Sequence, residues 1–208
     1  MIKLEKLQEP DVLRINSDRW TKELLASKDE DVKIKIKAKW NHRDIKTVLK
    51  KETHEKCAYC ESKPLHVTFG DIEHICPKSR RFELAYKWDN LTLACEVCNG
   101  NKGSAEDLVD PYIDDLPSKF AFFGPMIVEQ ENSGAAKRTR ITIDLNRGEL
   151  LARRCDHLGN IKNALDANRA NEDVAERTLT EEEIVRFYSR DGAEFSACAR
   201  KFISDYIE

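Results

Sequence analysis

The sequence predicts an α+β fold, in which a small core of two strands and one short helix is extended by helical segments at both ends and by an added pair of strands. Three observations predict it. Two Cys-x-x-Cys pairs bracket a stretch near the middle of the chain. Short runs of alternating apolar and polar residues are typical of strands, and apolar residues at helical spacing occur towards both ends.

The N-terminal segment is predicted to be mainly helical. Ser17 can cap a helix whose apolar residues are Trp20, Leu24 and Leu25. A second helix, directly before the first cysteine pair, is indicated by Ile45, Val48 and Leu49. Between the two helices, residues 32–37 alternate with period 2, which suggests a short strand.

The central part of the chain is predicted to contain strands. Residues 65–72 are predicted to form the first hairpin strand, and residues 91–102 to form the second cysteine pair running into a short helix. Residues 120–128 and 139–145 are predicted to be the added strand pair, across a polar loop at 129–138. The second of these strands is indicated by the alternating Ile141, Ile143 and Leu145.

The chain beyond Arg147 is predicted to be helical. Thr180 and Glu183 form a Thr-x-x-Glu capping box, and three aromatic residues recur at helical spacing, Phe195, Phe202 and Tyr206. We therefore divide the chain into a helical and basic segment, a zinc-bound core, an added strand pair and a helical C-terminal region, which together are expected to form one compact unit: 1–56, 57–110, 111–147 and 148–208.

The zinc expected in the core follows from the cysteines. Each Cys-x-x-Cys pair alone could be a redox dithiol, but two pairs fit a tetrahedral four-thiolate zinc site better: Cys57, Cys60, Cys95 and Cys98. The segment between the pairs is longer than the roughly 15–20 residues of a zinc ribbon, so it carries something more. The other three cysteines are predicted to be buried small apolar groups, with no disulfides: Cys76, Cys155 and Cys198.

Composition limits the location of the protein. The start of the chain lacks the apolar run of a signal peptide, and no stretch approaches the roughly 20 apolar residues of a membrane span. The thiolate-ligand spacing of the cysteines fits a reducing compartment. We therefore expect a cytoplasmic protein with no membrane partner. The formal net charge of −3 argues against a nonspecific nucleic-acid coat but permits a local groove.

The segment between the cysteine pairs contains chemical motifs. It includes a Glu73-His74 pair followed by Pro77-Lys78-Ser79, a Trp-x-Asn-Leu stretch at 88–91, and Cys-x-x-Cys-Asn-x-x-Lys at 95–102. These motifs resemble the HNH endonuclease family, and most of all the subgroup that accompanies an ATPase in Septu-type and retron-linked phage defence. The resemblance covers residues 57–102 and implies a ββα-metal HNH core with the signature His74, Asn90 and Asn99.

The residues themselves support this chemistry. A histidine beside a metal-binding carboxylate can activate water and bring a cation to a phosphate, so His74 is the candidate base. Glu73 and Asn99 are candidate ligands of a catalytic Mg²⁺ or Mn²⁺, because hard cations prefer oxygen atoms. Asp71 lies on the same strand face as Glu73 and is an alternative or additional ligand.

Two further residues are assigned near this site. By resemblance, Asn90 ties the loop and orients the base without contacting the metal. Lys102 is predicted either to meet a phosphate oxygen or the developing charge, or to be a solvent-facing helix cation. The remaining histidines are expected to be structural or solvated: His42, His54, His66 and His157.

Charge is segregated along the chain. Residues 33–56 carry nine Lys/Arg against three acidic residues, and residues 171–208 carry ten acidic residues against five Lys/Arg. The basic stretch is either a track for a phosphate backbone or a solvated face. Three cations after the candidate base are predicted to contact nucleic acid: Lys78, Arg80 and Arg81. The acidic end suits a protein partner.

The sequence therefore predicts a metal-dependent HNH endonuclease that hydrolyses DNA. By resemblance, it is the effector subunit of an anti-phage complex with an ATPase, and a retron reverse transcriptase is a further possible partner. Two alternatives stay open: a stand-alone restriction-type nuclease, and a zinc-stabilised adaptor without catalytic activity.

Overall fold

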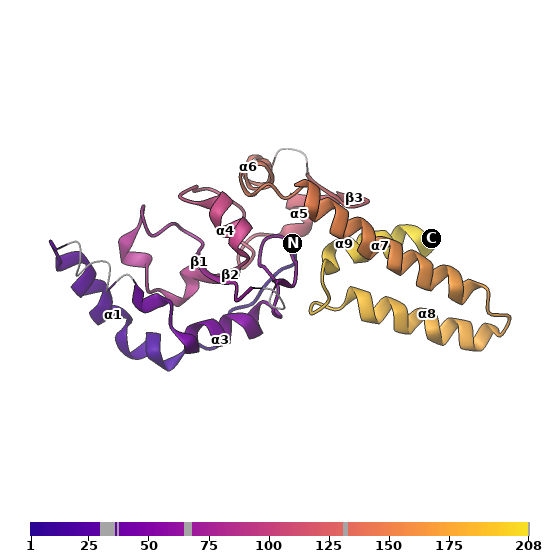
Figure 1. The fold of residues 1–208 in the computed structure, drawn as a ribbon, viewed down its shortest axis with the longest axis horizontal. Helices are drawn as coiled ribbons and strands as arrows, with labels where there is room; N and C mark the ends of the chain where they lie inside the picture. The colour runs from indigo at the N-terminus through magenta and orange to yellow at the C-terminus, as the bar shows by residue number, and fades with distance from the viewer. Residues whose placement is uncertain (30–35, 37, 65–67, 131–132, 208) are drawn as a thin grey trace.

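The computed structural model describes residues 1–29, 36, 38–64, 68–130 and 133–207 (Figure 1). Two small antiparallel sheets lie among helices, which confirms the predicted α+β class. The N-terminal helices and the first sheet lie towards one end of the molecule, and a group of C-terminal helices extends towards the other. No helix among the described residues is long and apolar enough to cross a membrane.

Among the described residues, the N-terminal side contains α1 (Asp11–Ala26) and α3 (Arg43–Glu52). α1 begins after Pro10, whose carbonyl accepts hydrogen bonds from the amides of Leu13 and Arg14. The prediction that Ser17 caps this helix is wrong, because Ser17 lies inside it. α3 confirms the second predicted helix and is capped by the His42 ring, which accepts a hydrogen bond from the Asp44 amide. A short 3-10 turn, η1 (Ala38–Trp40), precedes it. Most of the strand predicted at 32–37 lies outside the described residues.

The central sheet is a hairpin packed against α3. β1 (Asp71–His74) pairs antiparallel with β2 (Leu91–Ala94), from Asp71 opposite Ala94 to His74 opposite Leu91. The predicted start of the first strand is wrong for residues 68–70, because the turn at Gly70 has a φ of +63° that interrupts an extended chain. Residues 65–67 lie outside the description. The buried side chains of this half include Leu13, Trp20, Ile45, Leu49, Ile72, Leu91 and Leu93.

Two 3-10 turns, η3 (Phe82–Leu84) and η4 (Trp88–Asn90), connect the strands of the hairpin. After β2, the helix α4 (Glu96–Lys102) begins at Cys95, whose sulfur accepts a hydrogen bond from the Cys98 amide at 3.5 Å. The predicted second cysteine pair therefore does run into a short helix, and strand, strand and helix together make the expected core.

An added strand pair exists, but both of its strands lie within residues 120–129, so the prediction of a single strand over 120–128 is wrong. β3 (Phe120–Phe123) and β4 (Met126–Glu129) pair with each other across Gly124, whose φ is +53°. Residues 139–145 were predicted as the second strand, and this is wrong: α6 (Gly134–Ile143) occupies most of that segment. Ser133 caps α6, and its buried residues are at helical spacing, namely Ala136, Thr139 and Ile143. The small helix α5 (Leu116–Lys119) precedes β3.

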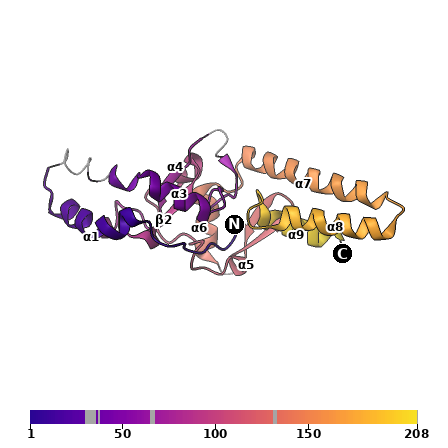
Figure 2. The same cartoon turned by 90° about the horizontal axis from the view of Figure 1, so that it is seen from below.

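Three helices complete the chain: α7 (Gly148–Arg169), α8 (Val174–Ser189) and α9 (Ser196–Ile207). Both views show α7 and α8 running side by side away from the centre of the molecule (Figure 2). The capping box predicted at Thr180 is wrong, because Thr180 lies inside α8 and the cap is Asp173, which accepts hydrogen bonds from the amides of Ala175 and Glu176.

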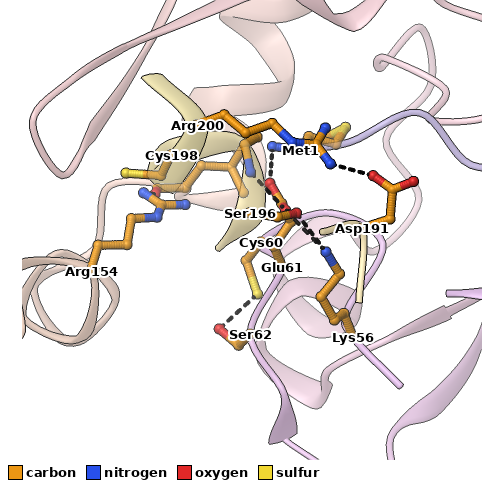
Figure 3. A network of polar contacts seen from close by, with 12 residues as sticks. Met1, Lys56, Cys60, Glu61, Ser62, Arg154, Asp191, Ser196, Cys198 and Arg200 are labelled. Atoms are coloured by element: carbon orange, nitrogen blue, oxygen red, sulfur yellow. Dashed lines mark hydrogen bonds and ion pairs between the residues drawn. The ribbon is translucent and has the colours of Figure 1, made fainter. Parts of the chain in front are cut away.

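The helix α9 returns to the first cysteine pair. Glu61 directly follows Cys60 and is buried; its carboxylate accepts from the Ser196 hydroxyl at 2.9 Å and pairs with Lys56 at 3.2 Å (Figure 3). The ammonium group of Met1 contacts the other carboxylate oxygen at 2.6 Å. Because these groups come from distant parts of the chain, the network joins α9 to the turn that carries Cys57 and Cys60.

Candidate metal centre and active site

The four paired cysteines converge at one point. Cys57 and Cys60 come from the turn after α3, and Cys95 and Cys98 from the start of α4. All four are buried, and their sulfur atoms lie within 4.8 Å of one another, with 3.9 Å between Cys60 and Cys95. A tetrahedral zinc with Zn–S bonds of about 2.3 Å separates its sulfur ligands by about 3.8 Å. The cluster therefore has the composition and spacing that zinc requires.

Arg147 borders this cluster, which the sequence did not reveal. It precedes α7, and its guanidinium donates to the Cys98 sulfur at 3.8 Å and to the Asp144 carbonyl at 3.1 Å. A cation near four thiolates offsets part of their negative charge. No sequence pattern indicated this contact.

Two side-chain contacts between polar residues join β1 to α4. The Asn99 amide donates to the Asp71 carboxylate at 2.8 Å. Lys102, one helical turn further along, pairs with Glu73 at 2.6 Å. Asp71 and Glu73 share a strand face because they are two residues apart. The structure thus brings all three predicted oxygen ligands, Asp71, Glu73 and Asn99, to the interface between β1 and α4.

Lys102 is buried, so the prediction of a solvent-facing cation is wrong. Its ammonium donates to the His74 carbonyl at 2.8 Å in addition to pairing with Glu73. Burial raises the pKa of Glu73, and the nearby Lys102 charge opposes that rise. Lys102 therefore sits inside the site as the counter-charge of Glu73.

His74 is the last residue of β1, and only 2% of its surface is exposed. Its Nε2 lies 3.0 Å from the Ala85 carbonyl oxygen. Because a carbonyl can only accept, Nε2 must donate, and in the neutral ring Nδ1 then carries the lone pair. Burial, helped by the Lys78 charge, lowers the pKa of His74 to about 4 and keeps the ring neutral at pH 7.

The ring of Trp40 contacts that of His74 edge to face, with 5.1 Å between their centroids. The Lys78 ammonium lies over the same tryptophan ring, 4.7 Å from its centroid. Trp40 is therefore a second residue at the site that sequence reasoning missed. Its distance in sequence from His74 explains why no motif indicated it.

Asn90 holds the loop that surrounds His74. Its side-chain oxygen accepts from the Cys76 amide at 2.7 Å, and its side-chain amide donates to the carbonyls of Cys76 and Leu84 at 3.0 and 3.1 Å. Leu84 adjoins Ala85, the acceptor for His74. Asn90 thus fixes both the end of β1 and the carbonyl that orients the imidazole.

The predicted nucleic-acid contacts differ in their surroundings. Arg80 faces Glu106 at 3.8 Å, and Arg81 pairs with Glu83. Lys78 lies over Trp40, next to the candidate base. Of the three, Lys78 is the one placed beside the candidate base His74.

The remaining cysteines and histidines differ in how far they are buried. Cys198 is buried as predicted, Cys76 is partly buried, and the prediction of a buried Cys155 is wrong because it is exposed on α7. His157 packs against Tyr188 and Phe195. His42 caps α3, His54 is exposed, and His66 lies outside the described residues.

Comparison with known proteins agrees with the motifs. Residues 57–105, which contain the cysteine cluster, β1, β2 and α4, match the HNH endonuclease family. A Septu protein PtuB from Bacillus thuringiensis is 34% identical over 83 residues, covering 38% of this chain and 32% of the relative. A Septu protein PtuB from Bacillus mycoides (strain KBAB4) is 34% identical over 118 residues, covering 48% and 40%. The predicted resemblance is confirmed, and the chain spans less than half the length of these relatives.

Proposed function

We propose that this protein is a metal-dependent HNH endonuclease that hydrolyses DNA within an anti-phage defence system. The observation that carries the proposal is the arrangement of Asp71, Glu73 and Asn99 between β1 and α4, with His74 at the end of the same strand. The match of residues 57–105 to the HNH endonuclease family supports it. The similarity to Septu protein PtuB supports the defence role.

Two metals are proposed, with different ligands. The four cysteines hold a structural zinc that ties the turn after α3 to α4. The oxygen atoms of Asp71, Glu73 and Asn99 suit Mg²⁺ or Mn²⁺, because hard cations take oxygen ligands. Such a cation, when bound, stabilises negative charge on the phosphate oxygens.

His74 acts as the general base in this proposal. The Ala85 carbonyl fixes the Nε2 proton, which leaves Nδ1 to accept a proton from the attacking water. The lowered pKa keeps the imidazole unprotonated and ready at neutral pH. Asn90 maintains the orientation of the ring through the Leu84–Ala85 turn, and Lys102 balances the charge of Glu73.

Plasmid cleavage by the purified protein with Mg²⁺ or Mn²⁺ tests the catalytic assignment. His74→Ala should abolish cutting while zinc content stays at the wild-type value, because the base takes part in the chemistry and not in zinc binding. Its melting temperature should fall, because the buried ring packs on Trp40 and is hydrogen-bonded to the Ala85 carbonyl. His157→Gln is the control, since it alters a partly buried histidine far along the chain, on α7. Wild-type cutting by His74→Ala would place the active site elsewhere. A protein that holds zinc but cuts no nucleic acid would be an adaptor.

The partner proposed from the resemblance is an ATPase, and α8 is the proposed docking surface. None of the residues of α8 is buried, and its exposed apolar side chains include Val174, Leu179 and Phe187. Glu181, Glu182 and Glu183 give it negative charge. The names of the relatives give no support for a reverse-transcriptase partner.

The docking test must spare α9, because Cys198, Ala199 and Ile203 of that helix belong to the hydrophobic core. Deleting residues 171–208 would remove this part of the core, so a truncation cannot isolate the partner surface. Leu179→Glu together with Phe187→Glu should abolish co-purification with an ATPase encoded beside this gene, while zinc content stays at the wild-type value. Retained binding would place the docking surface elsewhere. Purified protein that cuts DNA without any partner would favour a stand-alone nuclease.

A further inference from the structure

The outer face of α3 carries several cations. Arg43, Lys50 and Lys51 form no ion pair with any carboxylate of the part of the chain that the structure describes. By contrast, Lys162 and Lys201 on the C-terminal helices pair with Asp166 and Asp205. The positive charge of the α3 face is therefore available to an external anion.

Two adjoining hollows follow this face. The first, of about 360 Å³, is lined by Arg43, Lys46, Lys50 and Phe69 among others. The second, of about 390 Å³, shares Thr47 and Lys50 with the first and is also lined by Lys51 and Lys63. Among the described residues that line the two hollows, Glu55 is the one acidic residue. A chain of anionic groups would therefore meet cations along both.

Phe69 stands at the edge of the first hollow with 82% of its surface exposed. The turn around it is held in place: the Lys46 ammonium donates to the Gly70 carbonyl at 2.9 Å, and the Gly70 amide donates to the Thr68 hydroxyl at 3.0 Å. A single exposed aromatic side chain is common on protein surfaces. Here, however, it is held beside a hollow whose charged neighbours are cations.

We propose that the α3 face and Phe69 bind single-stranded DNA, with phosphates on Arg43 and Lys50 and an unpaired base stacked on the Phe69 ring. Cationic grooves with an aromatic stacking platform bind single strands in this way, and a duplex does not offer its base faces. The inference rests on the proposed nuclease function. Phe69 precedes β1 and His74 ends it, so the two lie at most about 17 Å apart at roughly 3.4 Å per residue. A strand bound at Phe69 therefore lies within about 17 Å of the backbone of the proposed base.

Binding can be measured apart from cleavage. Fluorescence anisotropy would follow a labelled 20-nucleotide DNA, single-stranded or as a blunt duplex, binding the full-length His74→Ala protein over a range of salt concentrations. In this background, Arg43→Gln with Lys50→Gln should reduce the slope of log K against log salt by about 0.7 for each of two lost phosphate contacts. Lys162→Gln with Lys201→Gln removes the same charge from ion-paired positions and should leave the slope unchanged.

Substitution of Phe69 tests stacking. Phe69→Ala should weaken single-strand binding roughly 5- to 150-fold, which corresponds to about 1–3 kcal/mol per stacked base. The salt slope and duplex binding should not change, and Phe69→Trp should restore affinity. Four outcomes would each overturn the inference. Phe69→Ala could weaken single-strand and duplex binding equally, or could weaken neither. The protein could bind RNA of the same sequence more tightly than the single-stranded DNA, or polyglutamate could displace the labelled DNA as well as unlabelled single-stranded DNA does.

The two proposals fail separately. If wild-type protein cuts no DNA but the binding results follow the expected pattern, the nuclease proposal fails and the single-strand site stands. If the protein cuts DNA but the Phe69 and Arg43/Lys50 variants bind single strands like the His74→Ala parent, only the single-strand site fails.

Discussion

Replacing Lys102 by Met would test whether the interior of the site is held together by charge. The side chains of Lys102 and Glu73 are 1% and 7% exposed, and Lys102 also donates to the His74 carbonyl. Methionine keeps most of the side-chain volume but leaves the Glu73 carboxylate buried without its partner. Removing one member of a buried ion pair costs about 3–5 kcal/mol, a large part of the roughly 5–15 kcal/mol that stabilises a domain.

The expected loss corresponds to a fall in melting temperature of roughly 6–20 °C, because each kcal/mol shifts a domain of this size by about 2–4 °C. Thermal and urea unfolding would measure it. Lys87→Met is the control, because Lys87 pairs with Asp18 on the surface and should matter little. Mn²⁺ should raise the melting temperature of Lys102→Met more than that of wild type, since the released Glu73 carboxylate then faces the cation.

A double substitution completes the test. Lys102→Met combined with Glu73→Met removes both charges, so the double variant should recover much of the stability that the single variant loses. If the stability lost by the double variant equals the sum of the losses of the two single variants, the side chains are not coupled. The assignment of Lys102 as the counter-charge of Glu73 is then refuted. A Lys102→Met protein as stable as wild type would refute it as well.

Three further predictions concern separate parts of the molecule. Cys98→Ser should lose zinc and unfold the core, and folded protein without zinc by elemental analysis and circular dichroism would contradict this. Asn90→Ala removes three hydrogen bonds and should lower the free energy of unfolding by about 1.5–4.5 kcal/mol, at about 0.5–1.5 kcal/mol for each bond; urea denaturation would measure the loss. Iodoacetamide at pH 8 should label exposed Cys155 and spare Cys198, because burial raises the pKa of Cys198 to about 11 and keeps it a thiol, as mass spectrometry of the labelled peptides would show.

The cysteine cluster and the α+β class could be predicted because each is indicated by short stretches of the sequence. The spacing of Cys57, Cys60, Cys95 and Cys98 places two thiolates on each of two tight turns, and the structure brings their sulfurs together. The helix at Arg43–Glu52 was predictable for a similar reason, since its apolar residues repeat at helical spacing within one short window.

The errors arose where a local pattern fitted two structures. Ile141 and Ile143 alternate as in a strand, yet Ile141 is exposed on α6 while Thr139 and Ile143 are buried at helical spacing. Contacts between residues that are distant in sequence could not be predicted either. Trp40 beside His74 and Arg147 beside Cys98 depend on how segments pack, which no single stretch of sequence records.

The contact between Glu61 and Ser196 has a consequence for biosynthesis. The ribosome makes the cysteine turns, the hairpin and His74 long before it makes residue 196, and domains fold as their segments emerge. Until α9 is released, Glu61 lacks the hydroxyl of Ser196 and the amide of Ala197, and the core lacks Cys198 and Ile203. A nascent chain therefore holds every proposed catalytic residue without the packing that completes their support. The order of translation would therefore delay maturation of the proposed active site until α9 had been made.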